Sequence, residues 1–213
     1  MTYVKASVRR PAGNPGNGIQ PKDQLVIYDV DDILSFPPRN EAGVVIEEDI
    51  VMKAGRYAIS IYLTPGTAEI SSNSDGETDA EGYTPSVKFN HPGNEQEIRE
   101  FKTNWLSKKC IVVLRYCSGK PADLIGTPCN PCKLSVSYTG SNESNTNELT
   151  FTQISKGDDI AIYRGTDTLE EPVAVVEAGA TDIDYQTDGQ YQLSAGAAKI
   201  AGVTGGSHGS VIT

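Results

Sequence analysis

The sequence predicts a mainly β protein, a β-barrel or sandwich with one flanking α-helix, a long acidic loop and extended termini. Three observations support this prediction. Short apolar runs with period-two alternation recur along the chain, turn residues separate these runs, and only one segment has helical periodicity. About ten strands and one helix are expected. A closed barrel or a sandwich is favoured because both architectures limit exposed sheet edges.

The first strands come from the N-terminal third of the chain. Residues 24–30, QLVIYDV, form a strand that ends at DDILSFPPRN, where two consecutive prolines cannot donate hydrogen bonds to a ladder. Residues 43–53 form a second extended stretch. Residues 57–63, YAISIYL, alternate between a polar and an apolar face. The apolar face of this run carries Ile59, Ile61 and Leu63.

A single helix is predicted at about residues 94–109, within HPGNEQEIREFKTNWLSKKC. Asn94 is expected to be the N-cap, because Glu97 follows three residues later in a capping-box pattern. Glutamates lie early and lysines late, as the helix dipole favours. One face of the helix carries the apolar residues Ile98, Phe101 and Trp105. We expect this face to pack on the core, with Trp105 largely buried.

The next segments complete the β domain. Residues 110–117, CIVVLRYC, are apolar on both faces, which predicts a central strand and a packing partner for the helix. KLSVSYT and ELTFTQI alternate and are joined by the polar connection GSNESNTN, and residues 158–165 form a further strand. We therefore divide the chain into an extended arm (1–24), a β domain (25–165) and a small β-rich extension (166–213).

The overall charge excludes several classes of partner. The 213 residues carry a net charge of −10 and give a pI near 4.7, a surface that repels nucleic acid and anionic lipid. No apolar run approaches the ~20 residues that cross a bilayer. The N-terminal segment lacks the apolar core of a secretory signal. We therefore expect a chain that folds in a cytoplasm and has no membrane partner.

The acidic stretch SDGETDAEGY is the first candidate functional site. Its acidic side chains occupy every second position: Asp75, Glu77, Asp79 and Glu81. Three interpretations remain open, namely a calcium loop, a solvated hairpin tip and an acidic surface in an assembly. The EF-hand spacing is not met, because the glycine follows the fourth acid and no late glutamate lies at the required distance.

The N-terminal arm is the second candidate. It is rich in Gly, Pro and Asn and is basic on an otherwise acidic protein, with Lys5, Arg9 and Arg10. Such a segment cannot form a core element by itself. It is either a free end or an arm that becomes ordered on a neighbouring subunit.

No pattern in the sequence indicates catalysis, a cofactor or a metal. The phosphate-loop, dinucleotide-binding, HExxH and GxSxG motifs are all missing from the sequence. The sequence CNPC resembles half of a zinc site, but Cys110 and Cys117 should lie on opposite faces of one strand and cannot both join Cys129 and Cys132. We expect buried thiols and no enzyme. A stand-alone β-sandwich module that binds glycan or peptide is the alternative from a different class.

The stretch from DQLVIYDVDDILSFPPRN through LTPGTAEI, HPGNEQEIREFKTNWLSKKC and LIGTPCNPCKLSVSYT resembles phage tail tube proteins, in particular those of phages that infect Bacteroidetes. The similarity spans about residues 20–165. The same barrel occurs in head–tail connector and collar rings of crAss-like phages.

The resemblance implies a structural virion protein that assembles in the host cytoplasm. It implies hexameric rings joined edge to edge, which stack into a tube through which phage DNA passes without specific binding. The arm and a long insertion would bridge successive rings, and other tail or connector proteins would be neighbours. The acidic loop would then be either that insertion, meeting Arg9 and Arg10 of a neighbour, or part of an acidic lumen.

Overall fold

The computed structural model describes residues 6–14, 16–18, 20–117 and 119–169, together with four short strands beyond residue 169. The chain divides into two compact units, residues 1–169 and residues 170–213. The described part of the first unit contains twelve strands, the 3-10 helix η1 (Val30–Asp32) and the α-helix α1 (Gln96–Trp105). In chain order these strands are β1 (Pro21–Asp29), β2 (Ile33–Ser35), β3 (Val45–Ile46), β4 (Val51–Met52), β5 (Ile59–Tyr62), β6 (Glu69–Asp75), β7 (Gly82–Pro92), β8 (Cys110–Tyr116), β9 (Ala122–Ile125), β10 (Cys132–Gly140), β11 (Asn145–Gln153) and β12 (Ala161–Tyr163).

The second unit contains four three-residue strands among its described residues. They are β13 (Ala174–Val176), β14 (Asp182–Asp184), β15 (Tyr191–Leu193) and β16 (Gly202–Thr204). Two parallel pairs result, because β13 pairs with β15 and β14 pairs with β16.

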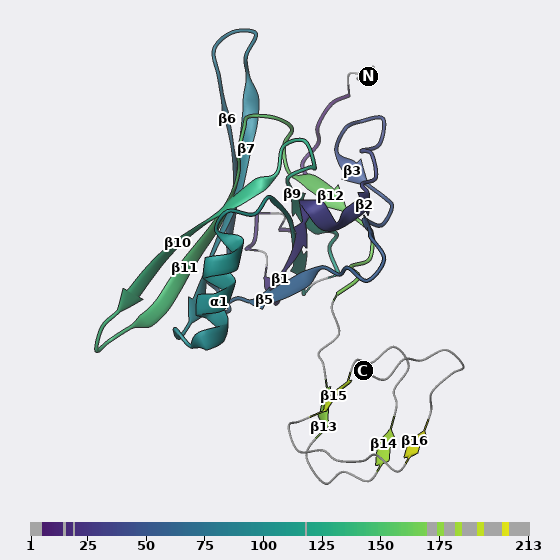
Figure 1. Cartoon of the computed structure of the whole chain (residues 1–213). Coiled ribbons are helices and arrows are strands. Elements are labelled where there is room, and N and C mark those ends of the chain that lie inside the picture. Colours follow the sequence, from purple (N-terminus) through teal and green to yellow (C-terminus); the bar gives the residue numbers. More distant parts are fainter. Residues whose placement is uncertain are drawn as a thin grey trace. The chain divides into compact units, whose positions relative to one another are not determined.

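Ten strands of the first unit form one sheet with two wings (Figure 1). One wing has the order β5-β1-β8-β9-β12-β3, and the other has the order β6-β7-β11-β10. The wings meet where Cys132 of β10 pairs with Cys110 of β8. A separate short pair, β2 with β4, lies outside this sheet.

The two wings enclose the larger core. Its buried side chains come from both wings, so the wings face each other as the layers of a sandwich. They include Leu25, Ile27, Ile61, Val112, Leu114 and Ile125 from the first wing, Leu63 just beyond β5, and Val87, Phe89, Leu134, Leu149 and Phe151 from the second wing. The prediction of a mainly β fold with one flanking helix is confirmed.

A second core lies on the opposite face of β1 and β8. Residues 30–58 and the segment that ends at Leu169 cover this face. Its buried members include Val26, Tyr28, Ile46, Ile50, Ile111, Val113, Leu124 and Tyr163. Strand β8 therefore has apolar neighbours on both faces, as its sequence predicted.

The helix is shorter than its sequence predicted, and the expected N-cap is wrong. The N-cap is Glu95, and no side chain caps the helix there. Instead, the Oδ1 atom of Asn94 accepts a hydrogen bond from the Nζ atom of Lys102 at 2.9 Å. At the other end the helix stops at Trp105, and Lys108 leaves the helical path to pair with the buried carboxylate of Asp29.

The apolar face of the helix is only partly buried. Ile98 is buried in the larger core, whereas Phe101 and Trp105 are half-buried at its margin. The two rings stack with centroids 5.6 Å apart, and the ammonium group of Lys108 lies 5.1 Å from the Trp105 ring centroid. Phe101 and Trp105 both pack against the larger core, as expected for this face of the helix.

No helix in the described part of the chain is long and apolar enough to cross a membrane.

Candidate functional site

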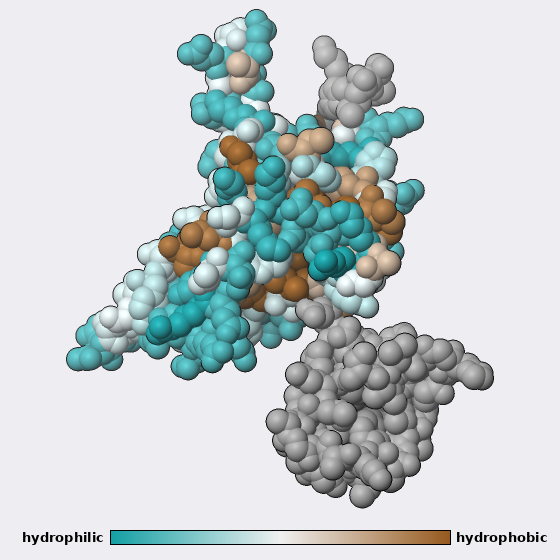
Figure 2. All heavy atoms as spheres, in the orientation of Figure 1, coloured by the Kyte–Doolittle hydropathy of each residue, from teal (hydrophilic) through white to brown (hydrophobic). Residues whose placement is uncertain are grey.

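The acidic stretch lies at the end of the hairpin formed by β6 and β7. The strands pair from Glu69 opposite Lys88 to Asp75 opposite Gly82, and residues 76–81 form the connection. This hairpin projects from the body of the first unit, and its projecting end is hydrophilic on the face shown in Figure 2. The sequence left three interpretations open: a calcium loop, a solvated hairpin tip and an acidic surface in an assembly. The local structure of the stretch is that of a hairpin tip.

The tip is a compact turn. Gly76 has φ +143°, and a Cβ atom there would lie 2.3 Å from the carbonyl oxygen of Ala80, so only glycine fits. The backbone N–H of Ala80 donates to the carbonyl oxygen of Glu77 at 2.9 Å, and Asp79 has φ +69°. The turn therefore holds its acidic side chains on an ordered backbone.

All four acidic side chains are exposed, and one has a basic partner within the chain. Asp75 pairs with Lys156 at 3.1 Å, and the hydrogen bond from Lys156 lowers the pKa of the Asp75 carboxyl, with a smaller effect from the N–H of Gly76. The Lys156 side chain reaches Asp75 by passing close to Gly82. A Cβ atom added to Gly82 would lie 3.1 Å from Lys156 Cβ, so a larger residue there would crowd this side chain. Within the described residues, the other three acidic side chains form no ion pair.

Among the described residues, no hydrogen bond or ion pair joins the basic arm to the acidic tip. Lys5 lies outside the described residues, and Arg9 and Arg10 are exposed. Arg10 donates only to the carbonyl oxygen of Gly13, at 3.4 Å. Over the described residues 6–18, the arm makes no hydrogen bond to the rest of the first unit.

The outward face of the wing β6-β7-β11-β10 is polar throughout. The strands alternate, so the large apolar residues face the core, and the side chains that face away from it are hydroxyl, amide or charged. Apart from Gly82 and Pro92, this face carries Glu69, Ser71, Asn73, Asp75, Thr84, Ser86, Lys88, Asn90, Lys133, Ser135, Ser137, Thr139, Thr146, Glu148, Thr150 and Thr152. It is rich in hydroxyl groups, and most of the acidic stretch lies at the tip beyond it.

Among the described residues, both edges of this wing are open. Within that part of the chain, β6 over residues 69–75 makes backbone hydrogen bonds to β7 alone, and β10 over residues 133–140 makes them to β11 alone. An edge strand presents a row of unpaired N–H and C=O groups that can pair with another chain. The two hairpin tips lie at opposite ends of β7, since Gly82 adjoins one tip and Pro92 pairs beside the other.

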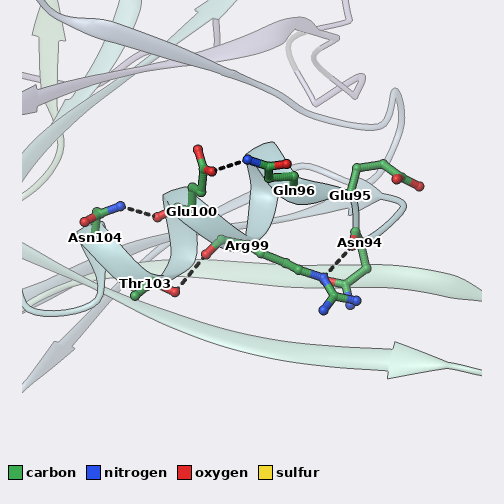
Figure 3. Close-up of a pocket in the computed structure, with 7 residues that line it drawn as sticks. All are labelled: Asn94, Glu95, Gln96, Arg99, Glu100, Thr103 and Asn104. Atoms are coloured by element: carbon green, nitrogen blue, oxygen red, sulfur yellow. Dashed lines mark hydrogen bonds between the residues drawn. The ribbon is translucent and has the colours of Figure 1, made fainter.

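The outer side of α1 forms a shallow polar surface that satisfies its own hydrogen bonds (Figure 3). Gln96 donates to Glu100 at 2.7 Å, and Arg99 Nε donates to the carbonyl oxygen of Asn94 at 2.7 Å. Thr103 and Asn104 donate to helical carbonyl oxygens. These polar groups are therefore engaged in hydrogen bonds within the helix and its N-terminal turn.

A buried ionic cluster fastens the end of the first unit to the second core. Asp167 accepts a hydrogen bond from the hydroxyl of Tyr28 at 2.6 Å and pairs with Arg115, whose Nη2 donates to the carbonyl oxygen of Gly165 at 2.7 Å. Burial raises the pKa of Tyr28, and the charge of Asp167 raises it further. Sequence reasoning missed this cluster because Tyr28 and Asp167 are far apart along the chain. It is a structural attachment.

The four cysteines are free thiols in two environments. Cys110 and Cys132 are buried at the junction of the wings, and Cys117 and Cys129 are exposed. Burial raises the pKa of Cys110 to about 12 and also raises that of Cys132, so both remain protonated. Among the described residues, no group of three His, Cys, Asp or Glu side chains lies close enough to hold a metal ion.

No protein-family model, curated protein or solved structure gives a significant match to the chain.

Proposed function

We propose that the protein is a structural component of a phage virion that assembles into rings, and that these rings stack into a tail tube through which DNA leaves the particle. The observation that carries this proposal is the four-stranded wing. It has a continuous polar face, two open edges and two hairpins that project at opposite ends. A ring needs complementary edges, and a stack needs elements that reach toward the next ring.

The polar face of the wing suits the wall of a channel for DNA. Excluding Asp75 at its end, the face carries two lysines, Lys88 and Lys133, and two glutamates, Glu69 and Glu148, so these charges balance. A wall of hydroxyl and amide groups with balanced charge gives phosphate no basic groove to bind. In this arrangement the acidic tip lies at a rim of the channel.

The acidic tip and the basic arm supply the contact between rings. Glu77, Asp79 and Glu81 lack a basic partner among the described residues of their own chain, and Arg9 and Arg10 lack an acidic one. Opposite charges on segments that do not meet within a chain favour pairing between copies. Such contacts between exposed groups weaken as salt rises.

Electron microscopy of the purified full-length chain at high concentration tests the proposal. Rings or tubes with a central channel are expected. A variant without residues 1–20 should fold with an unchanged thermal midpoint and form single rings that do not stack. Single rings alone from the intact chain would favour a head–tail connector or collar ring. Monomers alone at all concentrations would contradict assembly and leave the glycan- or peptide-binding module as the alternative.

A further inference from the structure

We infer that β6 of one copy pairs with β10 of the next copy in a single antiparallel register, with residues 69–75 opposite residues 139–133. This inference rests on the proposed assembly into rings and identifies the residues that join its subunits.

Strand direction makes the two edges compatible. The strands of the wing alternate in direction along β10, β11, β7 and β6, because all three pairings within it are antiparallel. With four strands, the two edges run in opposite directions. A second copy in the same orientation therefore presents β10 antiparallel to β6 and needs no inversion. Each copy uses each edge once, which is the head-to-tail geometry that closes into rings.

The pleat restricts the register. The side chains that β6 and β10 contribute to the polar outward face are at odd-numbered positions, so odd positions must lie opposite odd positions for this face to continue across the joint. Among such registers, one pairs the whole of β6 with β10. It places Ser71 opposite Ser137, and on the core side it places Ile70 opposite Tyr138, whose exposed fraction is 47% in the single chain.

The same register sets a stagger between copies. Within one chain, Glu69 lies level with Ser135, through Lys88 and Thr150. In the inferred joint, Glu69 lies opposite Thr139 of the neighbour, four residues further along β10. Four residues of stagger for four strands is the ratio found in eight-stranded barrels of shear eight, in which strands tilt by about 36°. A closed sheet with this stagger is therefore geometrically normal.

Charge agrees with the register. It places Asp75 opposite Lys133, which is exposed and forms no ion pair with any described residue of its own chain. Asp75 already contacts Lys156, so the joint would surround one carboxylate with two ammonium groups. An opposite-charge pair across neighbouring strands stabilises the pairing.

Cysteine crosslinking of the full chain tests the register. In a background with Cys117→Ser and Cys129→Ser, Ser71→Cys combined with Ser137→Cys should yield a ladder of covalently linked copies on mild oxidation. Asn73→Cys with Ser135→Cys, a second pair in the same register, should do the same. The matched control, Ser71→Cys with Lys133→Cys, would link only if copies were level, and each single variant should form no ladder.

The outcomes separate this inference from the proposed function. Rings seen by electron microscopy with no ladder from either pair, or with a ladder only from the level control, would overturn the inference and leave the ring assembly standing. Monomers alone would overturn both. As a second measurement, Asp75→Lys and Lys133→Asp should each weaken assembly about two- to five-fold, the range for exposed ion pairs, and the double variant should restore it. A double variant as weak as the single ones would contradict the Asp75–Lys133 pair.

Discussion

The two hairpins of the polar wing differ in what supports them. The end of β10–β11 is covered by α1. Asn147 is buried, it donates to the carbonyl oxygen of Gly93 at 2.6 Å, and it accepts from Lys102, whose ammonium group lies 5.2 Å from the Tyr138 ring centroid. Among the described residues, no helix covers the projecting end of β6–β7. Its partners there are the Lys156 side chain, one backbone bridge from Tyr83 to Gly157, and the Asp159 carboxylate, which accepts from the Ser72 hydroxyl.

Under the proposed assembly, this difference separates a hairpin that its own chain supports from a hairpin that a neighbouring copy supports. A two-stranded ribbon is at best marginally stable in water unless its face packs on something. The helix supplies that packing for β10–β11 within the chain. For β6–β7, the proposed packing partner is an adjoining copy.

The largest effect should come from the shared base of the hairpins. Phe151 of β11 is fully buried and stacks with Phe89 of β7, with ring centroids 6.4 Å apart. Phe151→Ala should lower the free energy of unfolding by about 3–5 kcal/mol because it leaves a cavity. Phe101→Ala, on the half-buried face of α1, is the comparison and should cost about 1–2 kcal/mol, since only part of its area leaves water. Equal losses in chemical denaturation would show that the helix lies deeper than described.

The next effect concerns the cover over β10–β11. Asn147→Ala should destabilise the chain by about 1–3 kcal/mol, because Gly93 and Lys102 each lose a hydrogen-bond partner at a buried position. Asn73→Ala, at an exposed position on β6, is the matched control and should change stability by no more than about 0.5 kcal/mol. Thermal denaturation of both variants measures the difference. A loss for Asn73→Ala as large as that for Asn147→Ala would remove the contrast.

A smaller effect on stability is expected from the acidic tip. Replacing Asp75, Glu77, Asp79 and Glu81 by Asn and Gln should leave the unfolding free energy nearly unchanged, because all four side chains are exposed, while weakening the stacking of rings. Light scattering at low and high salt measures stacking. If this variant stacks as well as wild type, the acidic tip has no role in stacking and is a solvated turn. A chelator that lowers the thermal midpoint of the wild type alone would support the calcium interpretation.

Acidification should show the smallest effect, through Asp75. Its pKa is lowered in the folded chain, so its ion pair contributes stability above the unfolded value of 3.8, and the contribution is lost as pH falls through the lowered pKa. Wild type and Asp75→Asn should therefore differ slightly near neutral pH and converge in strong acid. If the stability difference between wild type and Asp75→Asn grew on acidification, the lowered pKa of Asp75 in the folded chain would be contradicted.

Much of the fold could be predicted from local sequence patterns. Alternation identified β5, β10 and β11, and the doubly apolar run identified β8 as central, because these signals depend on neighbours along the chain. The helix ends could not be predicted in this way. Asn94 has the chemistry of an N-cap, but its side chain binds Lys102 instead, a residue a further two turns along. Tertiary contacts decided between the two uses.

The candidate site shows the same limit. The sequence located the acidic stretch and the basic arm, but not the open edges of β6 and β10. The edges depend on which strands pair. Among the described residues, β8 meets β10 at one residue pair only, so the rest of that edge of β10 has no partner strand. The cluster of Asp167, Arg115 and Tyr28 likewise depends on long-range pairing.

Hydrogen–deuterium exchange tests the central claim, that a neighbouring copy supports β6, most directly. The full chain is compared as dilute monomer and as assembled material, with β8 as an internal reference that should be protected in both. Alternate residues of β6 direct their N–H groups to β7 and to the open edge. We predict that the amides of residues 69–75 that face the open edge exchange rapidly in the monomer and slowly in the assembly, because pairing with a neighbour occupies that edge. Unchanged, rapid exchange over residues 69–75 in a sample that contains rings would contradict the claim.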